Sequence, residues 1–390
     1  MPVRTVLSTN IEYISILDEH GAFDAELGKG LISDEDVVKL YEHMTVCRHF
    51  DGIAFKLQRS GRMGTYPENR GQEAASLGAV YALRKDDWLV PCYRENPGLF
   101  WRGLPMEYIL LHWMGDERGN QIPDGLYMTP QAIPIGTQML HAVGLAWAGK
   151  YRGEDRIACT FFGDGATSEG DCHEALNFAA NLDLPVVFVC QNNGWAISVP
   201  AKMQCSAPTI AQRGLAYGMA CVQCDGNDIF AMVKVVRDAA ELARRSHRPT
   251  FIEAVTYRLG DHTTADDARR YRDAAEVEMW KKRDPLIRLR KYLVDRNQWD
   301  DEKERSLQAD AKEQVAAAVK RAEEIAAPRT TDMFDSLYAQ LPDQLRIQRA
   351  TLRTASLGQD PSQLEDTGTE FSRELKASAS SRTRSPAGRG

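Results

Sequence analysis

Along the chain, short apolar runs that favour β-strands alternate with longer segments whose apolar residues recur at helical spacing. The apolar runs predict strands over residues 87–90, 157–162, 185–190, 220–223 and 250–257. The periodic segments predict helices over residues 34–57, 71–83, 137–150, 168–182 and 229–246. Alternation of this kind is typical of a doubly wound, mostly parallel α/β sheet flanked by helices, and we expect that fold class.

The two ends of the chain depart from this pattern. Residues 1–32 are a mixed N-terminal arm, in which the alternation at Tyr13 and Leu17 fits either an edge strand or an extended arm. Residues 33–345 form the main domain, which becomes charged and helical from about residue 284. Residues 346–390 are rich in Ser, Arg, Gly, Pro and Thr, a composition that predicts a disordered tail.

The composition of the chain argues against nucleic acid and membranes as its partners. The chain has 390 residues, of which 43% are hydrophobic and 26% charged, and its net charge is −7. A negative chain is a poor ligand for nucleic acid or an anionic membrane. No apolar run reaches the roughly 18 to 20 residues that span a bilayer, and no signal pattern begins the chain. Eight scattered cysteines suit free thiols, so we expect a cytoplasmic protein.

Two polar motifs follow neighbouring predicted strands. Gly163-Asp164-Gly165 ends one apolar run, and Asn192-Asn193 ends the next, with room between them for a helix and a returning strand. Asp164 and Asn193 could give two oxygen ligands to a hard cation such as Mg²⁺, whose remaining ligands usually come from water and phosphate. This arrangement would hold a diphosphate at the carboxyl edge of the sheet. Two ordinary βα turns are the alternative.

Other residues could complete the same site. Tyr93-Arg94 follows a predicted strand, where an arginine could bind phosphate oxygens. Ile133 and Ile135 bring apolar side chains to the end of a long loop over residues 118–134, and long loops are usually functional. The small residues Gly165 and Ala166 would let a phosphate approach the free N–H groups of a helix start.

The last parts of this site are a tryptophan and a histidine. The main-chain carbonyl of Trp195 could add a third oxygen ligand. His262 lies among many polar residues after a predicted strand and could donate to phosphate or move a proton. Asp171 and Glu174 share one face of the helix after Asp164 and form either a solvated face or an acidic channel.

Together these motifs resemble one family, the alpha subunits of the thiamine diphosphate-dependent first component of 2-oxo acid dehydrogenase complexes. The resemblance runs from about Ser33 to Leu345. It rests on GRMGTY at 61–66, GQEA at 71–74, YRE at 93–95, GNQIP at 119–123, GDGATSEGD at 163–171, QNNGWAIS at 191–198 and the loop around His262. Bacterial members that act on pyruvate look most similar.

The resemblance assigns roles to individual residues. It implies that Tyr93 and Arg94 contact the diphosphate, with Gly165 and Ala166 beside it. It implies that Asp164, Asn193 and the main chain of Trp195 bind magnesium. Ile135 falls beside the aminopyrimidine, with Ile133 a further cofactor-binding candidate, and His262 falls on the active-site histidine.

The resemblance also implies a reaction and partners. Family members decarboxylate a 2-oxo acid and pass the acyl group to a lipoyl group on an acyltransferase. This chain is too short to hold both halves of the thiamine site, so the likeness implies a separate beta subunit in an α2β2 assembly, without which the chain is inactive. Pyruvate is the expected substrate, with branched-chain 2-oxo acids or acetoin as alternatives.

Two departures from the family pattern bear on specificity and control. Gln191 stands where branched-chain members carry an arginine, and Thr263 replaces the serine that mitochondrial members present for phosphorylation. A non-catalytic subunit is a further reading, which Asp164, Asn193 and His262 argue against. A flavin or nicotinamide oxidoreductase would need a GxGxxG turn after an early strand, and the sequence has none.

Overall fold

The computed structural model describes residues 3–335 and 337–356. These fall into two compact units, the first ending at Glu323 and the second beginning at Glu324. The second unit contains α14 (Asp332–Asp335) and α15 (Asp343–Ser356). In the described residues, no helix combines the length and apolarity needed to cross a membrane.

The centre of the first unit is a sheet of six parallel strands. In spatial order they are β1 (Tyr13–Ile14), β7 (Ala220–Asp225), β8 (Thr250–Val255), β4 (Val186–Asn192), β3 (Ala158–Gly163) and β2 (Trp88–Val90). The register between β3 and β4 pairs Gly163 with Gln191, so the two strands end together. This confirms the predicted doubly wound parallel sheet, and it brings the two polar motifs to one edge.

Helices cover both faces of the sheet because the central strands are apolar on both sides. Val187 and Val189 of β4 belong to the same buried cluster as residues of α2, α3 and α10. Phe188 and Cys190 point the other way and cluster with residues of α6 and α7. The helices of these two layers are α2 (Asp34–Arg59), α3 (Glu73–Ala82), α10 (Ile229–Ser246), α6 (Thr137–Arg152) and α7 (Gly170–Asn181).

The remaining elements are short or peripheral. The α-helices are α1 (Ala25–Gly28), α4 (Asn96–Arg102), α5 (Met106–Met114), α8 (Ala201–Gln204), α9 (Gln212–Leu215), α11 (Ala274–Lys281), α12 (Pro285–Asp295) and α13 (Asp301–Glu324). Three 3₁₀ helices are η1 (Glu117–Asn120), η2 (Asp164–Ser168) and η3 (Ala268–Arg270). A small antiparallel hairpin joins β5 (Trp195–Ala196) to β6 (Val199–Pro200).

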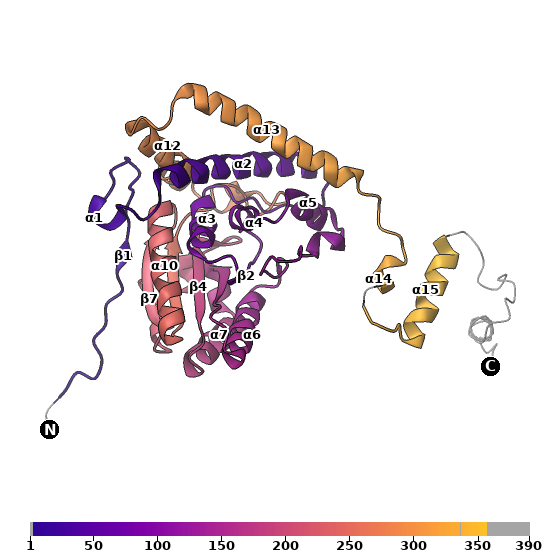
Figure 1. The fold of residues 1–390 in the computed structure, drawn as a ribbon, viewed down its shortest axis with the longest axis horizontal. Helices are drawn as coiled ribbons and strands as arrows, with labels where there is room; N and C mark the ends of the chain where they lie inside the picture. Colours follow the sequence, from indigo (N-terminus) through magenta and orange to yellow (C-terminus); the bar gives the residue numbers. More distant parts are fainter. Residues whose placement is uncertain (1–2, 336, 357–390) are drawn as a thin grey trace. The chain divides into compact units, whose positions relative to one another are not determined.

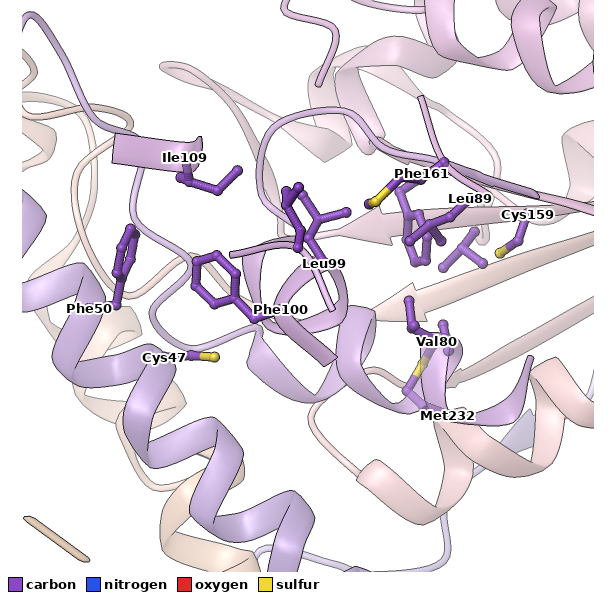
Figure 2. Packing of buried hydrophobic residues seen from close by; sticks show 14 of the residues in the cluster. Cys47, Phe50, Val80, Leu89, Leu99, Phe100, Ile109, Cys159, Phe161 and Met232 are labelled. Carbon is purple, nitrogen blue, oxygen red and sulfur yellow. The ribbon is translucent and has the colours of Figure 1, made fainter. Parts of the chain in front are cut away.

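The helix α13 lies along α2 (Figure 1). Their contact includes hydrogen bonds from Tyr41 Oη to Glu304 at 2.8 Å and between His49 and Gln308. Beneath α2, the rings of Phe50 and Phe100 meet edge to face with centroids 5.0 Å apart (Figure 2). This packing fixes α4, and therefore the segment before it that carries Arg94.

The N-terminal piece forms an edge strand. Tyr13 and Ile14 pair in parallel with Gln223 and Cys224 of β7. Just beyond them, the buried carboxylate of Asp228 accepts the backbone N–H groups of residues 16 and 17 at 2.6 and 2.7 Å. Of the two structures predicted for this segment, an edge strand or an extended arm, the chain therefore forms the edge strand.

The structure differs from the sequence prediction in two C-terminal regions. The helical region from residue 284 is broken between α12 and α13, where Asp300 caps the new helix by accepting from the N–H groups of residues 302 and 303. The segment predicted as a disordered tail begins as helix, because α15 extends to Ser356. Leu345 and Leu352 are both half-buried and lie seven positions apart, the spacing that gives a helix an apolar face. The rest of that predicted tail lies outside the described residues.

Replacement of Asp87 by alanine is expected to destabilise the fold. Its fully buried carboxylate accepts from Arg244 at 2.5 and 2.9 Å, and also from the N–H groups of residues 84 and 157. Removal of one partner leaves a buried charge unpaired, which typically costs about 3 to 5 kcal/mol. Urea unfolding should show this loss, whereas Arg84→Ala, which breaks an exposed pair with Asp155, should cost less than about 1 kcal/mol. Equal losses would contradict the account.

Candidate active site

A cavity of about 530 Å³ lies where the segments following β2, β3, β4 and β8 meet. The carboxyl ends of parallel strands share one edge of the sheet, and ligands bind outside that edge. The cavity is lined by ten of the residues singled out in the sequence: Tyr93, Arg94, Ile133, Ile135, Asp164, Gly165, Ala166, Asn193, Trp195 and His262. The structure thus brings together segments that are 169 positions apart in the chain, from Tyr93 to His262.

Asp164 is a buried carboxylate at the end of β3, with 2% of its surface exposed. Burial raises the pKa of Asp164 to about 6. The charge of Arg258 and a backbone hydrogen bond from Asn193 lower this pKa, but burial has the larger effect. Gln204 Nε2 is 3.4 Å from its Oδ2 atom. Within the part of the chain that the structure describes, no ion pair neutralises it, so this carboxylate lacks the cation that a buried charge requires.

Asn193 follows β4 and is also buried. Its Oδ1 accepts the backbone N–H of Trp195 at 3.2 Å, and its Nδ2 is 3.4 Å from Gln72 Oε1. These contacts fix the amide orientation, and the N–H of Asn193 bonds to Asp164. The oxygen groups of Asp164 and Asn193 are therefore held on adjacent strand ends.

Gly165 is required by close packing. A Cβ atom at this position would lie 2.6 Å from the Cβ of Ala196 in the β5–β6 hairpin. The short η2 helix occupies residues 164–168, so α7 begins at Gly170, two residues after the predicted start. The absence of a side chain at position 165 therefore allows the hairpin to pack against η2.

A cluster of two arginines surrounds His262. Arg94 Nη1 donates to Glu68 O at 2.6 Å, and Arg94 Nη2 is 3.1 Å from His262 Nδ1. Arg258 Nη1 is 3.3 Å from the same nitrogen, and Arg258 Nη2 donates to Ile197 O at 2.8 Å. Because guanidinium groups only donate, Nδ1 is the acceptor and the neutral ring carries its proton on Nε2.

His262 is expected to be neutral at physiological pH. Burial and the charges of Arg94 and Arg258 lower the pKa of His262 from 6.5 to about 4. The folded chain therefore binds fewer protons than the unfolded chain between these pH values, and this residue makes the fold less stable as the pH falls from about 6.5 to about 4. The pH dependence of His262 modification by diethyl pyrocarbonate, measured by peptide mass spectrometry, should show a midpoint near 4. A midpoint at or above 6.5 would contradict this electrostatic environment.

Three exposed isoleucines lie at the mouth of the cavity. Ile133, Ile135 and Ile197 line the cavity yet are 43%, 41% and 57% exposed. Ile197 adopts a φ of 55°, which is a strained value for a β-branched side chain. Its carbonyl accepts from the buried Arg258, a contact that holds this conformation in place.

Several lining residues were not predicted from the sequence, namely Gln72, Glu95, Gln204 and Arg258. Gln191 also lines the cavity, and its sequence position pointed only to specificity. Burial raises the pKa of Glu95 to about 7, and its Oε1 accepts from Gln191 at 2.5 Å. A glutamine in the GQEA or QNN motif carries no chemical signal of its own, and only the fold shows that these side chains reach the cavity.

Polar atoms in the cavity wall remain unpaired. Among the residues that the structure describes, Gln72 Nε2, Trp195 Nε1 and Arg258 Nε are buried donors that find no hydrogen-bond partner. Unsatisfied buried donors are costly, and three of them on lining residues suit a ligand with acceptor oxygens or nitrogens.

Asp171 and Glu174 do not join this site. Both are exposed on α7, and neither lines the cavity. Their position agrees with the solvated helix face that the sequence analysis held as an alternative. An acidic channel would need both side chains in the cavity wall.

Comparison with known proteins identifies the family. The profile of the dehydrogenase E1 component matches residues 41–330, which include every segment that lines the cavity. The chain belongs to the dehydrogenase E1 component family. The resemblance inferred from the motifs, to alpha subunits of thiamine diphosphate-dependent 2-oxo acid dehydrogenases, is confirmed.

Curated relatives of this E1 component match it over nearly their full length. The 3-methyl-2-oxobutanoate dehydrogenase subunit alpha of Mycobacterium tuberculosis is 43% identical over 354 residues, covering 90% of this chain and 96% of that protein. The pyruvate dehydrogenase E1 component subunit alpha of Staphylococcus aureus is 39% identical over 341 residues, covering 87% and 92%. The two named substrates differ, so family membership fixes the class of reaction and leaves the acyl group open.

Proposed function

We propose that this chain is the alpha subunit that binds thiamine diphosphate and Mg²⁺ for the decarboxylation of pyruvate and transfer of the acetyl group to a lipoyl group. The observation that carries the proposal is the cavity itself. It combines a buried, unneutralised carboxylate at Asp164 with buried donors at Arg94 and Arg258. A divalent cation and a diphosphate would satisfy these two groups together.

The residues present fit a magnesium diphosphate. Asp164 Oδ, Asn193 Oδ1 and the carbonyl of Trp195 are the hard oxygen donors that Mg²⁺ prefers. The carbonyl of Trp195 is already fixed by Arg258, at 3.4 Å. Gln72 Nε2 and Arg258 Nε, which have no partner within the described part of the chain, could donate to the cofactor's acceptor atoms.

Bound thiamine diphosphate would supply the nucleophile and electron sink for the decarboxylation. The chain's own residues would bind, orient and exclude water. Arg94 and Tyr93 would hold the diphosphate, and Ile133 and Ile135 would pack on the aminopyrimidine. His262, neutral and protonated on Nε2, could donate a hydrogen bond or move a proton in acyl transfer.

A beta subunit is needed to complete this site. The isoleucines at the mouth, Ile133, Ile135 and Ile197, are exposed in the chain alone. A partner that covers them would bury their apolar surface and dry the cavity, which strengthens every electrostatic interaction within it. We therefore propose an α2β2 heterotetramer, with the acyl group passed to a lipoyl-bearing acyltransferase. The proposed compartment is the cytoplasm.

Branched-chain 2-oxo acids are the second candidate substrates. The relative named for 3-methyl-2-oxobutanoate has 43% identity to this chain, compared with 39% for the pyruvate relative. Against this, Gln191 replaces the arginine of branched-chain members, and it contacts the buried Glu95 in the cavity wall. The GRMGTY segment also follows the bacterial pyruvate pattern.

Substrate competition tests this assignment. The chain, co-expressed with its beta subunit and supplied with cofactor and Mg²⁺, should decarboxylate pyruvate with a higher kcat/KM than 3-methyl-2-oxobutanoate. A higher value for the branched acid would move the substrate to the second candidate. Absence of decarboxylation with both acids, in a complex that binds the cofactor, would overturn the proposed activity.

A further inference from the structure

A buried carboxylate outside the cavity organises two of its loops. Asp51 lies on α2 with 2% of its surface exposed, and it does not line the cavity. Its Oδ1 accepts from Tyr66 Oη at 2.5 Å and from Asn69 Nδ2 at 3.1 Å. Its Oδ2 accepts the backbone N–H of Asn69 at 2.7 Å. All three hydrogen bonds go to the two ends of one four-residue stretch, Tyr66–Asn69, which we call the clamp segment.

The clamp segment in turn holds the His262 loop. Tyr66 N donates to Thr264 Oγ1 at 3.1 Å, and Thr264 N donates back to Tyr66 O at 3.1 Å. This reciprocal pair fixes the backbone two residues beyond His262. The loop that begins at Arg258 is therefore anchored to the clamp segment at Thr264.

The clamp segment also holds Arg94. The carbonyl of Glu68 accepts from Arg94 Nη1 at 2.6 Å, while the other terminal nitrogen of Arg94 faces His262. Asn96, two residues after Arg94, donates from Nδ2 to Tyr66 Oη at 2.9 Å and from its backbone N to Asn69 Oδ1 at 3.3 Å. The clamp segment thus contacts both the side chain of Arg94 and Asn96, which begins the helix after it.

We propose that Asp51 is a positioning residue, which acts through the clamp segment to hold Arg94 and His262 in the geometry that binds the cofactor diphosphate. The proposal rests on the proposed function for the identity of the ligand. Asp51 touches neither ligand nor reacting atoms in this arrangement. It aligns two loops that come from the ends of different strands, β2 and β8.

Burial of the Asp51 carboxylate is energetically costly, so packing alone does not explain an aspartate at this position. Burial raises the pKa of Asp51 to about 7, opposed by the hydrogen bonds of Tyr66 and Asn69. Within the described residues, no arginine or lysine forms an ion pair with it, and the charge of Glu68 also raises its pKa. An apolar residue would fill the space at lower cost, but it could not accept three hydrogen bonds from one segment.

The test compares Asp51→Asn with a matched buried carboxylate elsewhere. Asp228 is fully buried and also accepts three N–H groups, from residues 16, 17 and 230, but it lies outside the cavity and the clamp segment. Each variant is made in the chain co-expressed with its beta subunit. Two readouts are taken: the affinity for thiamine diphosphate with Mg²⁺, and the pH dependence of His262 labelling by diethyl pyrocarbonate.

Asp51→Asn is expected to weaken cofactor binding by about ten-fold or more, the usual effect of losing a supporting contact behind a ligand-binding group. His262, released from the arginines, should regain a pKa nearer its ordinary value. Its labelling at pH 5, relative to pH 7.5, should then fall about two-fold or more. Tyr66→Phe, which removes one of the three hydrogen bonds to Asp51 together with the bond from Asn96, should give smaller changes in the same direction. Asp228→Asn should change neither readout, although it lowers stability.

The outcomes separate the two proposals. Unchanged cofactor affinity and unchanged His262 labelling in both Asp51→Asn and Tyr66→Phe would overturn the positioning role and leave a merely structural one. If Asp51→Asn does not fold, Tyr66→Phe decides alone. Failure of the unmodified complex to bind the cofactor would overturn the proposed function, and the labelling, which needs no cofactor, would still show whether Asp51 positions His262.

Discussion

Replacement of Asp164 by alanine is expected to abolish magnesium-dependent binding of thiamine diphosphate while leaving the fold intact. Asp164 is the only aspartate among the described residues that line the cavity, and its carboxylate forms no ion pair with them. Loss of a ligand that binds the metal directly should weaken binding by more than about 100-fold, beyond the effect of supporting contacts. Because burial raises the pKa of Asp164 to about 6, removal of this group should not destabilise the chain.

Calorimetric titration of the variant complex measures this loss directly. Glu174→Ala is the matched control, because Glu174 is an exposed carboxylate on α7, the helix that follows η2, and does not line the cavity. The control should bind the cofactor as the unmodified complex does. Unchanged affinity in Asp164→Ala would remove Asp164 from the metal site. Weakened affinity in Glu174→Ala would revive the acidic-channel interpretation.

Replacement of His262 by alanine is expected to separate binding from turnover. The imidazole is no ligand of the proposed metal site, so magnesium-dependent binding should remain. Acyl transfer should slow by about 10² to 10⁴-fold, the usual contribution of a positioned acid or base. Reductive acetylation of a lipoyl domain, followed alongside decarboxylation of pyruvate, shows which step has slowed.

The control for this variant is a histidine outside the cavity. His49 on α2 is hydrogen-bonded to Gln308 at the contact with α13, so His49→Ala should keep full turnover. A His262→Ala enzyme with unchanged rates of both steps would refute the proposed role. A His262→Ala enzyme that fails to bind cofactor would instead make the residue part of the binding site.

Much of the fold could be predicted from the sequence because its central strands are strongly apolar and bounded by clear turn residues. The 186–192 and 158–163 strands are buried on both faces, which gives continuous apolar runs. The helices α4 and α5 were missed because α4 is only seven residues long with Pro97 in its first turn, and α5 follows it after a break of three residues. Short helices depend on tertiary contacts more than on pattern.

The site could be predicted where residues able to bind a metal directly follow a predicted strand. Asp164 and Asn193 follow adjacent strands, so the sheet topology places them together. The contacts between Asp51, the clamp segment and the two loops could not be inferred, since these residues are separated by up to 213 positions, from Asp51 to Thr264, and no local pattern links them. Asp171 and Glu174 share a helix face, but periodicity does not say whether that face meets the cavity or solvent.

Titration of thiamine diphosphate with Mg²⁺ into the chain co-expressed with its beta subunit is the most direct test of the central claim that this cavity is a magnesium diphosphate site. Binding should be saturable and should disappear when Mg²⁺ is chelated and when Asp164 is replaced by alanine. Binding that is independent of Mg²⁺, or no binding in the assembled complex, would contradict it.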